Sequence, residues 1–153
     1  MRADPENSLQ SDLEILRRFP VKPKYLAMKI PKKTICIIAD DMFFSSKIES
    51  AAKRLDVSMV KARNREEFQD KVEGKKVDLV IIDLASKRID AEEIFIRLRN
   101  SAINKETFCI GYLPHVERDL AAKFREKGVD LVLPRSKFSQ KMSTVIKEHL
   151  EPK

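Results

Sequence analysis

Glycine is scarce in this sequence, with three residues among 153. They stand far apart, at positions 74, 111 and 128, so the chain contains neither a GxGxxG pattern nor a P-loop. Both motifs use glycine to let the backbone approach a phosphate group closely. The sequence therefore argues against nucleotide binding by a glycine-rich phosphate cradle.

Long apolar runs and closely spaced cysteines are missing as well. No apolar stretch approaches the ~20 residues that span a bilayer, and the opening MRADPENSLQ lacks the apolar core of a signal peptide. Cys36 and Cys109 lie inside apolar runs, which predicts buried, reduced and inert thiols. Two cysteines and two histidines far apart give no zinc or redox-dithiol spacing. We expect a cytoplasmic protein that does not enter a membrane.

The N-terminal segment, residues 1–33, differs from the rest of the chain in charge. It carries eight Lys or Arg against four Asp or Glu, more than half of the formal net charge of +7. Leucines at helical spacing predict a short amphipathic helix over 8–19, and the prolines that follow predict an extended linker up to residue 33. The basic charge favours a solubilising role, and weak nucleic-acid binding through residues 1–33 stays open as an alternative.

Apolar strands and amphipathic helices alternate from residue 34 onward. The apolar runs lie at 34–39, 57–62, 77–83, 107–113 and 129–134, and helical patterns follow at 43–55, 64–76, 90–100, 116–128 and 136–150. Strands that are apolar throughout indicate a parallel sheet covered on both faces. Right-handed crossovers then give an α/β fold with an open, doubly wound, five-stranded sheet. The functional crevice of such a sheet lies at the carboxyl ends of its strands.

Three aspartates follow two of these predicted strands. Asp40 and Asp41 come directly after the first strand, and Asp83 ends the third. If these strands are neighbours, the carboxylates meet at one rim, either as solvated rim acids or as a binding site for a cation. Carboxylate oxygens suit a hard ion such as Mg²⁺, and an aspartate beside such an ion can accept a phosphoryl group.

Residues 34–150 resemble the receiver domain of bacterial response regulators, on the motifs IIADD and VDLVIIDL. The resemblance implies a flavodoxin-like sheet of order 2-1-3-4-5. It implies that the paired acids Asp40 and Asp41, with Asp83 and the carbonyl of Ala85, form a Mg²⁺ site. It also implies that Asp83 takes phosphate from a histidine kinase or a small phosphodonor, and it places Arg135 at the family's lysine position.

Several positions depart from the family's pattern. Leu113 stands where a Ser or Thr hydroxyl would contact the phosphoryl group, and Arg135 has a bulkier, planar head than lysine. Arg135 could therefore pair with Asp83 directly and take the place of the metal. We expect Tyr112 and Leu113 to cover the wall of the pocket. Further departures are Val132, Ser136, the pair Ser86-Lys87 and the pair Asp90-Ala91.

Two functional hypotheses follow from this pattern. The first is a stand-alone signalling receiver that binds Mg²⁺, is phosphorylated on Asp83 and alters its affinity for a protein partner, without being a turnover enzyme. The second is a pseudo-receiver that keeps the fold and binds a partner through a constant face. The stretch HVERDLAAKFREKGVDLVLPRSKF is similar to divergent stand-alone receiver-like proteins. Whether the chain forms a homodimer is left open.

Overall fold

A computed structural model of the protein describes residues 32–150. The predicted helix over 8–19 and nearly all of the predicted linker lie outside these residues. Both stay predictions, as does a separate N-terminal segment 1–33 ahead of a receiver-like domain 34–150. Among residues 32–150, no helix is long and apolar enough to cross a membrane.

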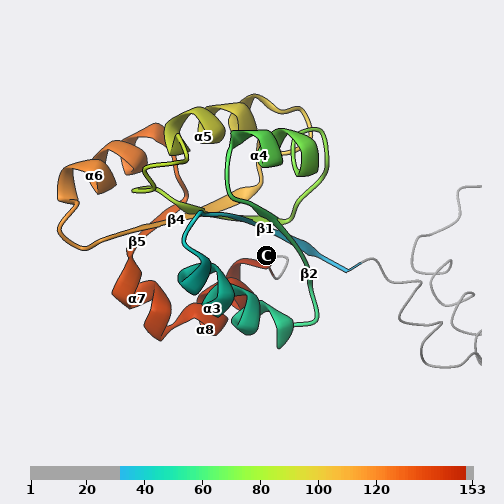
Figure 1. Ribbon diagram of the computed structural model, residues 1–153, viewed down its shortest axis with the longest axis horizontal. Helices are drawn as coiled ribbons and strands as arrows, with labels where there is room; N and C mark the ends of the chain where they lie inside the picture. Colours follow the sequence, from blue (N-terminus) through green and yellow to red (C-terminus); the bar gives the residue numbers. More distant parts are fainter. Residues whose placement is uncertain (1–31, 151–153) are drawn as a thin grey trace, which may run out of the picture. The chain divides into compact units, whose positions relative to one another are not determined.

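Five parallel strands form a single sheet in the order β2-β1-β3-β4-β5 (Figure 1). The predicted α/β fold and strand order are therefore confirmed. Every residue of β3 is buried, both the apolar run LVII and Asp83 at its end, whereas the edge strand β2 is mostly half-exposed. The strands are β1 Thr34–Ile38, β2 Ser58–Ala62, β3 Leu79–Asp83, β4 Phe108–Leu113 and β5 Leu131–Pro134.

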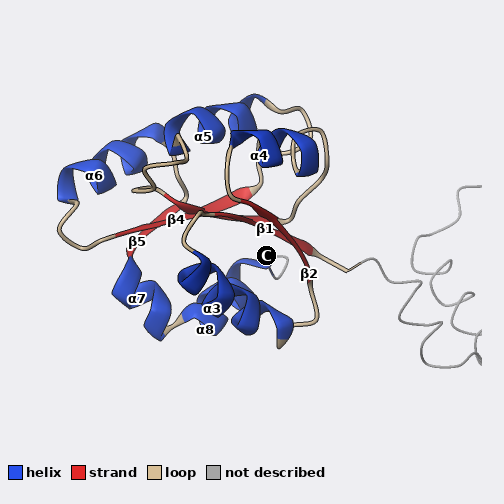
Figure 2. Cartoon of the chain, in the orientation of Figure 1, coloured by secondary structure: helices blue, strands red, loops and turns tan. Residues whose placement is uncertain are grey.

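Helices cover both faces of the sheet (Figure 2). The helices α4, α5 and α6 lie over one face, and α3, α7 and α8 lie over the other. Successive side chains of each strand point to opposite faces of the sheet. In β1, Cys36 and Ile38 lie in the core under α4–α6. Ile35 and Ile37 lie in the core under α3, α7 and α8. The bounds are α3 Met42–Lys53, α4 Arg65–Lys71, α5 Ala91–Asn100, α6 Arg118–Lys127, α7 Arg135–Gln140 and α8 Met142–Leu150.

Local sequence signals set most of the helix ends. The Asn64 side chain accepts a hydrogen bond from the backbone N–H of Glu67 and so begins α4, and Asp90 begins α5 in the same way. Gly128 ends α6 in a left-handed conformation with φ of 102°, which a residue with a Cβ rarely adopts. The predicted roles of these three residues are confirmed.

The last helical pattern, predicted as one helix over 136–150, forms two helices. The backbone leaves helical geometry at Lys141, with φ of −123° and ψ of 25°, and α8 begins at the next residue. Phe138 and Met142, on either side of the break, are both buried in the core beneath α3. The sequence pattern did not reveal the break because both segments keep their apolar side chains on the same core.

Candidate functional site

The sheet brings the predicted acids to one rim. Asp83 is the last residue of β3, and β1, its neighbour, ends two residues before Asp40. The parallel register pairs Ile38 with Ile82, so the two strands end at the same level. Three carboxylates from different parts of the chain thereby lie at the carboxyl edge of the sheet, where doubly wound folds carry their sites.

Asp83 is a buried carboxylate with two partners. Its side chain is only 4% exposed. One oxygen, Oδ1, accepts a hydrogen bond of 3.0 Å from the backbone N–H of Ala85, and Oδ2 lies 3.7 Å from Nη2 of Arg135. Burial raises the pKa of Asp83 above its ordinary value, and the Ala85 hydrogen bond and the Arg135 charge oppose that shift. The negative charges of Asp40 and Asp41 raise the pKa further.

Asp41 performs a structural task at this rim. Its Oδ1 accepts hydrogen bonds from the backbone N–H groups of Phe43, at 2.9 Å, and Phe44, at 3.3 Å, and so begins α3. Its second oxygen, Oδ2, lies 3.9 Å from Nη1 of Arg135. One carboxylate oxygen therefore stabilises the helix and the other faces the arginine.

Asp40 faces the loop after β3. The Ser86 hydroxyl donates a hydrogen bond of 2.8 Å to its Oδ1, and Nε of Arg88 lies 3.9 Å from its Oδ2. The same Ser86 oxygen accepts from the backbone N–H of Ile89, which holds the loop in a turn. Sequence reasoning treated Ser86 as a departure from the family's pattern and missed this contact. Only the three-dimensional path of the loop brings Ser86 to Asp40.

Arg135 occupies the space between Asp41 and Asp83. It is the first residue of α7, directly after β5, and its two terminal nitrogens each face one of these carboxylates. The guanidinium carbon lies 5.3 Å from the centre of the Phe44 ring and 5.8 Å from that of Tyr112, within cation–π range. The direct pairing with Asp83 that the sequence suggested is present.

Tyr112 forms the wall beneath Arg135. Its ring is fully buried, 4.5 Å from the Phe44 ring between centres, and its hydroxyl has no hydrogen-bond partner within residues 32–150. Burial raises the pKa of Tyr112, and the nearby Asp83 charge adds to the shift. Leu113 is also buried, but in the opposite core. The predicted covering role fits Tyr112, whereas Leu113 packs in the core under α4–α6 and its predicted role as pocket wall stays a prediction. The unpartnered hydroxyl could not be foreseen from the sequence.

The fit of this site to Mg²⁺ depends on Arg135. Three carboxylates provide the oxygen donors that a hard cation prefers. However, Asp40 is turned toward Ser86 and Arg88, and the arginine lies where Asp41 and Asp83 would share an ion. In the described part of the chain, no three His, Cys, Asp or Glu side chains are grouped to hold a metal. With Arg135 in this position the residues do not fit a divalent ion, and the Mg²⁺ set of Asp40, Asp41, Asp83 and Ala85 stays a prediction.

The chain has the fold of response-regulator receiver domains. The chain is similar to the response regulator from Hahella chejuensis, with 19% sequence identity and a TM-score of 0.69. The match covers 77% of this chain and 95% of the Hahella chain. The chemotaxis response regulator CheY4 of Vibrio cholerae matches 78% over 99%, with 12% identity and a TM-score of 0.68.

A third similar structure is that of the phosphorylated cyanobacterial phytochrome response regulator RcpA, with 15% identity and a TM-score of 0.67. It matches 78% of this chain over 95% of its own. No sequence-family model and no curated protein matches this sequence. At these identities the similarity establishes the fold, and function has to be argued from the site.

Proposed function

We propose that the protein is a signalling module of the receiver fold that binds a protein partner in one constant state and has no turnover chemistry. The observation that carries this proposal is the position of Arg135, 3.9 Å from Asp41 and 3.7 Å from Asp83. A guanidinium there supplies, from within the chain, the positive charge that three neighbouring carboxylates require. The domain then needs no metal ion to hold its rim together.

Two further features support a constant state. The Asp83 side chain is 4% exposed, so a phosphodonor has little access to its oxygens. Leu113 offers no hydroxyl at the position where the family has one, and its side chain is buried in the core under α4–α6. A phosphoryl group on Asp83 would therefore lack the partner that couples phosphorylation to a change in the surface.

Phosphorylation of Asp83 is the second candidate, and one observation favours it. The Arg135 side chain is 39% exposed, and at 3.7 Å its nitrogen lies beyond ordinary hydrogen-bond distance from Asp83. Arg135 can therefore swing toward solvent at moderate cost. Asp41, Asp83 and the Ala85 carbonyl would then hold Mg²⁺, and an Asp83 oxygen would take the phosphoryl group from a histidine kinase or a small phosphodonor.

Intact-mass measurement after treatment with acetyl phosphate and Mg²⁺ separates the two candidates. The samples are the wild type, Asp83→Asn, and Arg135→Lys, which restores the family's lysine. The proposal predicts no adduct on the wild type and no rise in its melting temperature with millimolar MgCl₂. A phosphoryl adduct on the wild type that Asp83→Asn abolishes would replace the proposal with the second candidate.

A further inference from the structure

The two helical faces of the domain differ in how their positive charges are compensated. On the α4–α6 face, Lys123 and Lys127 both lie 2.8 Å from Glu92, and these contacts lower the pKa of Glu92 to about 2. Arg97 on the same face pairs with Glu73 at 3.1 Å. Most cations on this face thus have acidic neighbours, although Arg118 and Arg125 of α6 form no ion pair within residues 32–150.

The face formed by α3, α7 and α8 lacks this compensation. It carries six exposed cations that form no ion pair within residues 32–150. Glu49 of α3 is engaged by Lys61 of β2, at 3.2 Å. The result is a predominantly positive surface, although the exposed Glu148 of α8 interrupts it. Such a surface attracts acidic partners and speeds their encounter. The six residues are Lys47, Lys53, Arg54, Lys137, Lys141 and Lys147.

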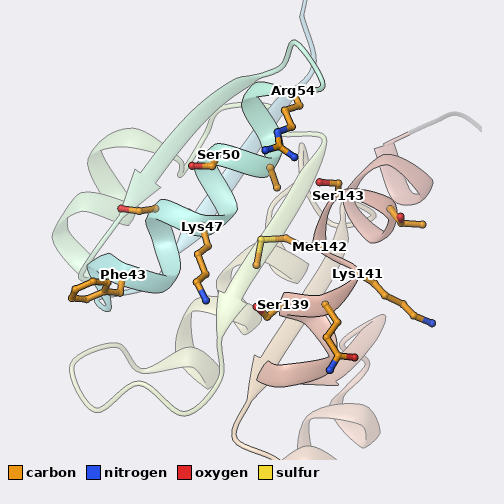
Figure 3. A pocket seen from close by; sticks show the side chains of 12 residues that line it. Phe43, Lys47, Ser50, Arg54, Ser139, Lys141, Met142 and Ser143 are labelled. Carbon is orange, nitrogen blue, oxygen red and sulfur yellow. The ribbon is translucent and has the colours of Figure 1, made fainter.

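A groove of about 600 Å³ runs between α3 and the α7–α8 segment on this face (Figure 3). Lys47 and Arg54 reach into it from α3, and Lys141 stands at its outer rim. Among the described residues 32–150, no acidic residue lines it. Its remaining polar lining consists mainly of hydroxyl groups, which can donate hydrogen bonds to carboxylates without adding charge. The residues that carry these hydroxyl groups are Ser46, Ser50, Ser139, Ser143 and Thr144.

The groove also has an apolar part. Ala51 and Met142 lie in its floor, and Phe43 lies at one end, next to the rim of the sheet. The Phe43 side chain is 88% exposed and its neighbour Met42 is 65% exposed, unusually high values for such large apolar residues. Covering an exposed phenylalanine ring removes a large apolar surface from water, so this exposed pair is a strong anchor point for a partner.

From these features we infer that the groove binds an acidic, partly apolar segment of a protein partner. Its carboxylates would meet Lys47 and Arg54, and its apolar side chains would cover Phe43 and Met142. α3 has twelve residues and is therefore about 18 Å long, which accommodates about three turns of a partner helix. This inference rests on the proposed function, for which it supplies the binding surface and the chemistry of the partner.

The apolar floor favours a protein segment over nucleic acid. Single-stranded nucleic acid is bound on successive aromatic side chains that stack its bases. The groove offers one aromatic residue, Phe43, and it lies at the end. Met142 is a flexible side chain suited to varied apolar partners. An amphipathic helix with acidic flanks matches both the charge and the floor.

Fluorescence anisotropy with a labelled amphipathic Glu/Leu peptide of about three helical turns tests the inference. A Lys/Leu peptide of the same pattern and an oligo-dT strand are the comparison ligands. The test variant is Lys47→Glu/Arg54→Glu. Its control is Lys76→Glu/Lys105→Glu, which changes the net charge equally at exposed lysines in the loops after α4 and α5.

We expect the wild type to bind the Glu/Leu peptide, the groove variant to bind it about tenfold or more weakly, and the control to stay within about twofold. Phe43→Ala should weaken binding several-fold at any salt concentration. Equal losses in both charge variants, tighter binding of oligo-dT, or no binding of the peptide would each overturn the inference. None of these results bears on the acetyl phosphate measurement, so the proposed function stands or falls separately.

Discussion

The strength of the Arg135–Asp83 contact can be predicted from its geometry. At 3.7 Å, two unit charges interact by about 4 kcal/mol with the effective dielectric constant of about 20 that suits sites near a protein surface. Because the Arg135 side chain is 39% exposed, water screens the pair, and we reduce the expected coupling to about 2 kcal/mol. Asp41 and Arg135 are both more than a third exposed and add at most about 1 kcal/mol.

A double-mutant cycle measures this coupling directly. Arg135→Gln should lower the free energy of unfolding by about 2 kcal/mol in the wild type, because it leaves Asp83 as a buried and unpaired charge. In the Asp83→Asn background the same change should have an effect of about 1 kcal/mol or less, since only the exposed Asp41 is left to pair with Arg135.

Urea denaturation of the four proteins at neutral pH gives the cycle, and a repeat at about pH 4 provides a second check. Burial raises the pKa of Asp83, so the folded protein protonates this carboxyl at a higher pH than the unfolded chain does, and the coupling should shrink as the pH falls. A coupling below about 0.5 kcal/mol at neutral pH would contradict the role of Arg135 as the internal cation.

Three further predictions concern neighbouring groups. Because the pKa of Asp83 is raised, the folded protein binds a proton on this carboxyl more tightly than the unfolded chain does. The protonated carboxyl therefore contributes stability at low pH, and this contribution is lost as the pH rises through the folded-state pKa. Asp83→Asn should therefore be more stable than the wild type at neutral pH, with an advantage that disappears on acidification; melting curves across this range check the sign. Tyr112→Phe removes a buried hydroxyl without a partner in residues 32–150 and should raise the free energy of unfolding by about 1 kcal/mol, whereas a loss of stability would show that the hydroxyl is hydrogen-bonded in solution. Gly111→Ala would place a Cβ 2.7 Å from Cγ of the buried Leu84 and should destabilise the fold by about 1–3 kcal/mol in urea titrations, which unchanged stability would contradict.

Local sequence patterns were enough to predict the order of strands and helices along the chain. Apolar runs and helical periodicity are local patterns, and they fixed five strands and the segments between them because each element must bury one or both faces. The caps at Asn64, Asp90 and Gly128 are local too and were predicted correctly. The predicted strands placed the aspartates at the carboxyl ends of β1 and β3, whereas the adjacency of these two strands was implied by the resemblance to receiver domains.

The contacts of those aspartates, in contrast, depend on how distant segments pack together. Asp83 and Arg135 are separated by more than fifty residues, and their pairing depends on the direction of each side chain and on the Phe44 and Tyr112 rings beneath them. The Ser86–Asp40 hydrogen bond and the uncompensated charge of the α3 groove likewise arise between distant segments. Local patterns determine which face of an element is buried. Which charged side chains become neighbours depends instead on how the elements pack against one another.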